Sequence, residues 1–99
     1  KALNNLASAY GRIGQYEDAA VTYQTALQHV PTEPTILNNL GTVYVRLQDY
    51  AQAEQSYLAA IHHGPRVKAP YENLSILYAS LGDKEKARSV QARAHALPN

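Results

Sequence analysis

The sequence predicts an all-α fold made of three helix-turn-helix repeats, six helices in all. Shifting the 99-residue chain against itself by 34 positions aligns identical residues at 12 of the 33 positions compared between the first two copies. Inside each copy, apolar residues recur every three or four positions, which is the spacing of an amphipathic helix. A chain of this length suits one domain. We expect its repeats to cover about residues 1–33, 34–67 and 68–99.

Each copy contains two helical stripes separated by a turn. In the first copy, the apolar residues Leu3, Leu6, Ala7 and Tyr10 share helical spacing, and Gly14 interrupts it. We expect these four side chains to pack inside the first helix pair. Eight tyrosines occur in the chain, and their repeat register indicates ring packing with the hydroxyl at the rim.

Prolines support the boundaries of the predicted helices. Pro31, Pro65 and Pro98 lie where the second helices end, because proline cannot continue a helix. Pro34 and Pro70 suit a first turn, where a missing N–H costs nothing. The predicted helices cover residues 2–13, 16–29, 34–47, 50–63, 69–81 and 84–97.

The motif LNNLASAY, followed by Ala19, Tyr23, Ala26 and Pro31, resembles the tetratricopeptide repeat, which also has a 34-residue period. The resemblance covers essentially the whole chain. It implies a right-handed superhelical array in which the first helix of each pair lines a concave groove. The departures from the family pattern are Leu3, Leu37 and Tyr71 in place of a frequent Trp, and Gln91 in place of an aromatic residue.

The two ends of the array are expected to differ. Residues 84–97 keep an apolar stripe that includes Ala87, Val90 and Ala94, but polar side chains such as Gln91 surround it. We therefore expect this helix to be a solvent-facing terminal cap. The first helix has no comparable polar face, so we expect further repeats to precede Lys1 in a longer parent protein.

Helical spacing predicts which side chains face the groove. They lie about 100° from the packed stripe of each first helix. In the first repeat these residues are Asn5, Ser8 and Arg12, with Asn4 nearby. The equivalent residues of the later repeats are Asn38, Asn39, Thr42, Val45, Arg46, Glu72, Asn73, Ile76 and Ser80.

Asn5, Asn39 and Asn73 form a ladder with one residue per repeat. In tetratricopeptide proteins that hold extended peptides, asparagines at these positions bond the peptide amides, so the resemblance implies the same role here. An amide side chain suits that role because it offers two donors and an acceptor. The alternative is that these residues are simply polar side chains on a wet face.

Arg12 and Arg46 lie on the same face of successive first helices and can pair with an acidic ligand side chain. The alternative is that they pair with Glu17, Asp18 or Asp49, which lie close in sequence.

Some members of the family bind a terminal carboxylate with groove lysines, an arginine and asparagines. Here Ser8, Ala69 and Asn73 stand where such members have basic or amide residues, which disfavours that mode. Val45 and Ile76 instead give the groove an apolar floor. An internal peptide segment with a hydrophobic anchor is therefore favoured as the ligand.

Several other functions lack support in the sequence. The chain has no cysteine and no catalytic motif, so we expect neither an enzyme nor a cofactor. His62 and His63 are adjacent and do not share a helix face, so we expect no metal site. A net charge of +1 does not indicate a nucleic-acid ligand, and no apolar run is long enough to span a membrane.

The sequence thus predicts a module that binds a protein or peptide partner in its groove. The alternative is a structural module that self-associates through its ends or its convex face. Cysteine content fits any compartment, and we slightly favour the cytoplasm.

Overall fold

The computed structural model describes residues 2–98, which form six α-helices and no strand. The helices are α1 (Ala2–Arg12), α2 (Tyr16–His29), α3 (Pro34–Arg46), α4 (Tyr50–His63), α5 (Lys68–Ser80) and α6 (Lys84–His95). The predicted all-α fold is confirmed, and each helix end lies within two residues of its predicted position.

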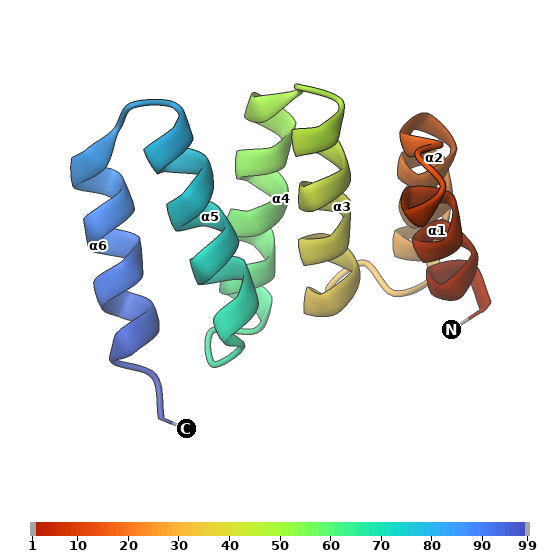
Figure 1. Ribbon diagram of the computed structural model, residues 1–99. Coiled ribbons are helices and arrows are strands. Elements are labelled where there is room, and N and C mark those ends of the chain that lie inside the picture. Colours follow the sequence, from red (N-terminus) through yellow and green to blue (C-terminus); the bar gives the residue numbers. More distant parts are fainter. Residues whose placement is uncertain (1, 99) are drawn as a thin grey trace.

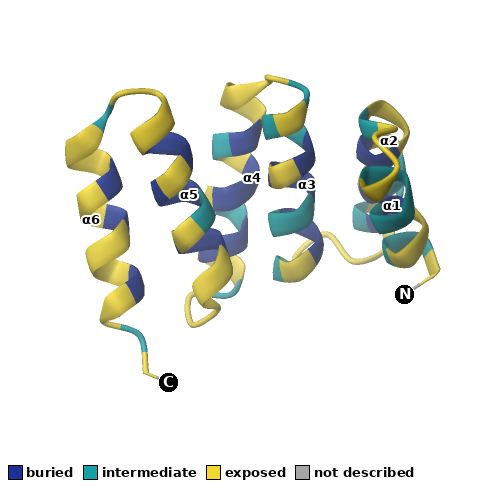
Figure 2. Cartoon of the chain, in the orientation of Figure 1, coloured by how far each residue is buried: buried dark blue, intermediate teal, exposed yellow. Residues whose placement is uncertain are grey.

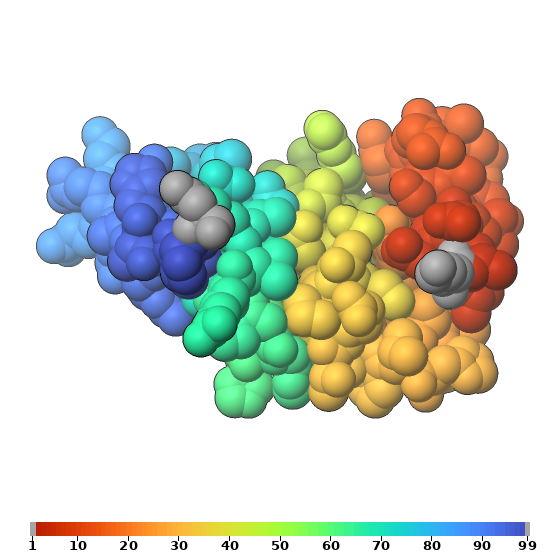
Figure 3. Space-filling view, turned by 90° about the horizontal axis from the view of Figure 1, so that it is seen from below, coloured from red at the N-terminus to blue at the C-terminus, as the bar shows by residue number. Residues whose placement is uncertain are grey.

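The helices pack as three antiparallel pairs that stand side by side (Figure 1). The strongest contacts lie within the pairs α1–α2, α3–α4 and α5–α6, and the pairs are joined by α2–α3 and α4–α5 contacts. The first helices also contact each other, α1 with α3 and α3 with α5. The stack measures 35 × 27 × 19 Å, and its space-filling surface runs continuously from α1 to α6 (Figure 3). One continuous face is therefore lined by α1, α3 and α5.

The hydrophobic core lies mainly between the repeats. One cluster joins the first and second repeats and includes Tyr23 and Leu40. Another joins the second and third repeats and includes Tyr57 and Leu74. Tyr44 packs against both clusters. Buried residues accordingly face the neighbouring helices, whereas the outer side of α6 is mostly exposed (Figure 2).

A close helix approach explains why small residues recur at one position of the first helices. A Cβ added at Gly41 would lie 2.7 Å from the Tyr57 ring, too close for two carbon atoms. The equivalent residues, Ala7 and Ser75, are also small and buried. Tyr57 itself is 2% exposed because its ring fills the space that Gly41 leaves.

The expectation that Leu6 packs inside the first helix pair is wrong. Leu6 is 46% exposed, whereas the equivalent Leu40 and Leu74 are 4% and 0% exposed. This position faces the preceding helix pair, which α3 and α5 have and α1 does not. Of the other residues expected there, Ala7 is fully buried, and Leu3 and Tyr10 are half-buried.

The opposite end of the stack is polar. Gln91 is exposed on α6, as the sequence predicts, and Arg88 and His95 are exposed beside it. The equivalent residues on α4 include Tyr57 and Ile61, which are covered by α5. Polar side chains at this end of α6 are therefore compatible with contact to water.

All three repeats use the same turn between their two helices. Residues Gly14, Gln48 and Gly82 have positive φ angles of 83°, 62° and 87°. In each turn the next N–H donates to the carbonyl five residues back, as Asp49 N does to Tyr44 O at 2.9 Å. This pattern is the Schellman motif, and it favours glycine at the left-handed position. Gln48 therefore carries backbone strain that its two glycine counterparts avoid.

A hydrogen bond between a tyrosine and a carboxylate links the second and third repeats. The Tyr78 hydroxyl donates to Glu54 Oε2 at 2.6 Å. Burial raises the pKa of Tyr78 to about 12, and the hydrogen bond and negative charge of Glu54 add to the shift, as does the charge of Asp83. The neutral phenol is thus the form that the fold stabilises.

We predict that Gln48→Gly stabilises the protein by about 0.5–1 kcal/mol, because relief of left-handed strain exceeds the entropy that glycine adds to the unfolded chain. Thermal unfolding should show a rise in Tm of about 2–8 °C for a domain of this size. The control is Gln48→Ala, which keeps a Cβ and should give no comparable rise. An unchanged or lower Tm for the glycine variant would contradict this explanation.

We also predict that stability falls as the pH rises between about 10 and 12. The pKa of Tyr78 is higher in the folded than in the unfolded protein. Its contribution to the free energy of unfolding is therefore complete below pH 10 and is lost as the pH rises through the folded pKa. Glu54→Gln should lower the pKa of Tyr78, because it removes the negative charge that disfavours tyrosinate. Tyrosinate absorbance measures this shift, with Glu85→Gln as the control. Identical titrations of wild type and Glu54→Gln would show that Glu54 has no such influence.

Candidate functional site

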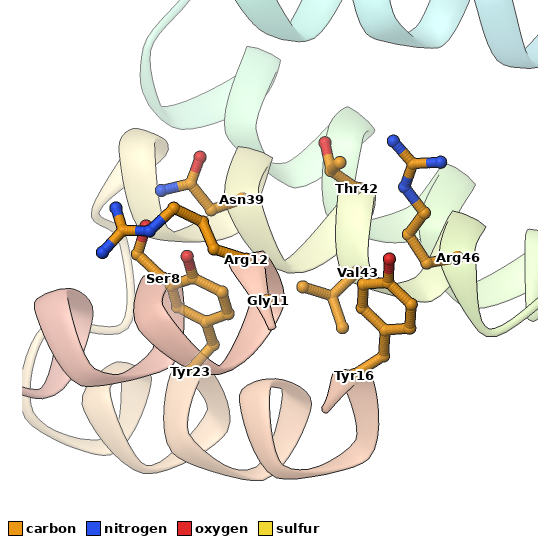
Figure 4. Close-up of a pocket in the computed structure, with 9 residues that line it drawn as sticks. All are labelled: Ser8, Gly11, Arg12, Tyr16, Tyr23, Asn39, Thr42, Val43 and Arg46. Atoms are coloured by element: carbon orange, nitrogen blue, oxygen red, sulfur yellow. The ribbon is translucent and has the colours of Figure 1, made fainter. Parts of the chain in front are cut away.

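The continuous face of first helices contains a cavity between the first and second repeats. This first cavity has a volume of about 430 Å³. Helices α1 and α3 form its sides, and α2 contributes two tyrosines (Figure 4). Its lining residues are Ser8, Gly11, Arg12, Tyr16, Tyr23, Asn39, Thr42, Val43 and Arg46.

A second cavity lies between the second and third repeats. It has a volume of about 230 Å³ and is lined by Thr42, Val45, Arg46, Tyr57, Asn73, Ile76, Leu77 and Ser80. Thr42 and Arg46 line both cavities, so the two are contiguous. We call the pair of cavities the groove. Each residue of the second cavity stands 34 positions after a residue of the first.

Buried tyrosines from the second helices form part of each cavity. Tyr23 and Tyr57 are 3% and 2% exposed, and Tyr57 shares a 2.9 Å hydrogen bond with the Thr42 hydroxyl. Burial raises the pKa of both phenols. Hydrogen bonds with Ser8 and Asn39 offset part of the shift at Tyr23, and the hydrogen bond with Thr42 and the charge of Arg46 offset part of it at Tyr57. Both tyrosines therefore stay neutral at physiological pH.

Two of the three asparagines of the predicted ladder lie in the groove. Asn39 lines the first cavity and Asn73 the second, whereas Asn5 is exposed on α1 and lines neither. Asn73 Nδ2 donates to Asn38 Oδ1 at 3.0 Å, a bond between repeats that sequence analysis missed. One amide donor of Asn73 is thus already used, and Asn38 has a structural role of its own. In the first repeat, the equivalent Asn4 Oδ1 is buried without a hydrogen-bond partner among the described residues.

Both predicted arginines line the first cavity from opposite sides. Arg12 comes from α1 and Arg46 from α3, and both side chains are exposed. Neither guanidinium forms an ion pair with a described residue, so the alternative of pairing with Glu17, Asp18 or Asp49 is not observed. No Asp or Glu lines this cavity.

Four more of the predicted residues divide between the two cavities, whereas Glu72 lies outside both and lines a cavity between α5 and α6, to which Asn73 and Ile76 also contribute. Ser8 lines the first, Val45 and Ile76 line the second, and Thr42 lines both. Ile76 is 67% exposed, so most of its apolar side chain faces water. The residues that sequence analysis did not assign to the groove are Gly11, Tyr16, Tyr23, Val43, Tyr57 and Leu77. The tyrosines were missed because a tyrosine in repeat register can pack its ring in the core and also present its hydroxyl at a cavity floor. The sequence pattern is the same in both cases.

Two other kinds of feature are absent from residues 2–98. No group of three or more His, Asp or Glu side chains is placed to hold a metal ion. None of the six helices is both long and apolar enough to cross a membrane.

Comparison with known proteins identifies the repeat. A family model described as tetratricopeptide repeat matches residues 4–65 and again residues 38–99. None of the curated protein sequences compared with the chain matches it significantly.

Solved structures of the same architecture superimpose closely on the chain. The second tetratricopeptide domain of Spaghetti (RPAP3), bound to HSP90 peptide SRMEEVD, gives a TM-score of 0.90 at 18% identity, covering 98% of this chain and 90% of that one. The first domain of the same protein, bound to the same peptide, gives 0.89 at 22% identity, with coverage of 94% and 74%. MamA gives 0.90 at 22% identity, with coverage of 94% and 54%.

At these sequence identities, the solved structures establish a shared fold. The two overlapping matches of the family model together cover almost all of the described chain. Together with the 34-residue register of helices, turns and cavities, these findings show that the chain belongs to the tetratricopeptide repeat family.

Proposed function

We propose that this protein is an interaction module that holds an extended peptide segment of a partner protein in its groove. The observation that carries the proposal is the pair of contiguous cavities, built from equivalent positions of successive repeats. An extended chain presents main-chain groups and side chains at regular intervals, as the repeats do. The proposed activity is binding, without a catalytic step.

The lining of the groove suits a peptide main chain. Asn39 and Asn73 supply amide groups, and an amide can donate to a carbonyl and accept from an N–H. Tyr23 and Tyr57 hold neutral hydroxyls at the floor, so the lining combines polar groups with buried ring surface. Both RPAP3 domains with this fold are bound to a peptide, which supports the same mode for this chain.

We further propose that the ligand is an internal segment, not a chain terminus. Ser8, Ala69 and Asn73 do not supply the basic set with which some family members hold a terminal carboxylate. Ala69 is exposed and lines neither cavity. Val45 and Ile76 instead present apolar surface to the groove, which an apolar side chain within a segment would cover.

A peptide-selection experiment tests the proposed function. Random peptides of about 12 residues, long enough to span the 35 Å stack, would be displayed on phage and selected on the immobilised protein. We expect binders with micromolar Kd, because a flexible segment loses entropy when it is ordered in an open groove. Calorimetry should show that Asn39→Ala/Asn73→Ala weakens binding about tenfold or more, through the loss of two ligand hydrogen bonds.

The matched control for that variant is Gln28→Ala/Gln55→Ala, which also removes two amides. Both glutamines are exposed on second helices and line neither cavity. Because Asn73 also bonds Asn38, the melting temperature of each variant would be measured as well. The groove would be refuted as the binding site if the selected peptides bound the asparagine variant as tightly as wild type. It would also be refuted if the glutamine variant bound them more weakly than wild type.

A second candidate function, self-association through the end of the stack, is favoured by one observation. Leu6 on α1 and Ile13 in the turn that follows it are 46% and 68% exposed, whereas Leu40, the equivalent of Leu6, packs against residues of α2. Sedimentation separates the two functions: self-association predicts a dimer that Leu6→Gln/Ile13→Gln returns to a monomer. A wild-type monomer at all tested concentrations would exclude this candidate.

A further inference from the structure

The two halves of the groove differ in chemistry although equivalent positions line them. Five of the eight shared positions keep the same type of residue in both cavities, with Leu77 in place of Val43 as one of them. The other three do not: Val45 stands in the second cavity where Gly11 stands in the first, Ile76 where Thr42 stands, and Ser80 where Arg46 stands. The second cavity is therefore more apolar and has one guanidinium fewer.

The first cavity is rich in unsatisfied donors. Arg12 and Arg46 each offer a planar guanidinium with five N–H groups, and neither is paired with a described residue. The Tyr16 hydroxyl, which lies on the Arg46 side of the lining (Figure 4), forms no hydrogen bond with a described residue. A carboxylate or phosphate accepts hydrogen bonds without donating any, so an anion complements this set.

Electrostatics supports the same occupant. Two arginines line a cavity whose lining contains no Asp or Glu, so no carboxylate of the lining neutralises their charge. An anionic side chain in this cavity would supply a counter-charge and accept charge-assisted hydrogen bonds.

The second cavity suits an apolar side chain. Val45, Ile76 and Leu77 contribute apolar surface, and Ile76 is 67% exposed. Each cavity's asparagine already makes one side-chain hydrogen bond, Asn73 with Asn38 and Asn39 with Tyr23, so the apolar lining is what distinguishes the second cavity. Covering the exposed Ile76 side chain with an apolar ligand group would remove that surface from water.

The spacing of the cavities sets the spacing of the ligand side chains. One cavity lies between α1 and α3 and the other between α3 and α5, and these first helices contact one another in succession, so we take the cavities to be one helix–helix spacing apart, about 8–10 Å. An extended polyproline II chain rises about 9.3 Å over three residues and returns to the same side. Two ligand residues three positions apart therefore fit the two cavities.

We propose that the groove selects an extended peptide carrying an anionic side chain for the first cavity and an apolar side chain, three residues away, for the second. This inference rests on the proposed function, because it describes the ligand of the same groove. Arg12 and Arg46 bind the anion from two sides, and Ile76 with Leu77 contacts the apolar residue.

Synthetic peptides test the pattern directly. A labelled proline-rich host peptide would carry Asp and Leu three residues apart, in both orders, because the two orders correspond to the two chain directions. One order should bind best, and replacing its Asp by Asn, or its Leu by Ser, should weaken binding about tenfold. Phosphoserine in place of Asp distinguishes the two sources of an anion, and binding at least as tight as that of the Asp peptide is expected for this donor set.

Variants locate each side chain in its cavity. Arg12 lines only the first cavity, so Arg12→Glu should abolish the preference for Asp over Asn and leave the preference for Leu. The matched control is Arg88→Glu, an equal charge reversal on α6 outside both cavities. Higher salt should weaken the Asp peptide and leave the Asn peptide unchanged.

A swap of cavity chemistry gives the sharpest test. Ile76→Thr/Ser80→Arg gives the second cavity the residues that the first has at those positions. Both residues are exposed, so the variant should keep its fold. We expect it to prefer a peptide with Asp at both positions over the original peptide, whereas wild type prefers the original.

The outcomes distinguish this inference from the proposed function. Selected peptides that need Asn39 and Asn73 but show equal affinity with Asp or Asn, and no switch in the swapped variant, would overturn the inference and leave groove binding intact. The absence of any peptide that binds through the groove would overturn both.

Discussion

The structure depends on contacts between successive helix pairs. A single pair cannot cover both of its apolar faces, so each repeat is completed by the next. The Tyr57 ring lies against Gly41 within the second pair, and the same buried tyrosine takes part in the cluster that binds the third pair. Tyr44 contacts both clusters. Packing of this kind fixes the spacing of α1, α3 and α5, and this spacing creates the groove.

Because the repeats are in register, a substitution at one of the equivalent positions changes the chemistry of one cavity without changing the arrangement of the helices. A tyrosine hydroxyl and an asparagine are present in both cavities. Exchange of Arg46 for Ser80 and of Thr42 for Ile76 at equivalent positions then changes a donor-rich cavity into a more apolar one. Packing and groove chemistry thus depend largely on different residues, and Tyr23 and Tyr57, which are buried and also line the cavities, contribute to both.

Sequence reasoning predicted the six helices because the 34-residue register, the apolar stripes and the prolines agree. It also identified Arg12, Arg46 and Ile76, since helical spacing defines the groove face. The Asn38–Asn73 bond was not predictable, because it joins residues one position out of register. Leu6 was misplaced because the stripe of a first helix faces both its partner and the preceding pair, and periodicity does not separate these directions.

Chemical-shift mapping of a selected peptide on the isotope-labelled protein tests whether the packed first helices form the recognition surface. We expect the largest shifts at Asn39, Thr42 and Arg46, continuing to Ile76, with little change on the outer faces of α2, α4 and α6. Shifts concentrated on the exposed side of α1 around Leu6, or on the second helices, would contradict it.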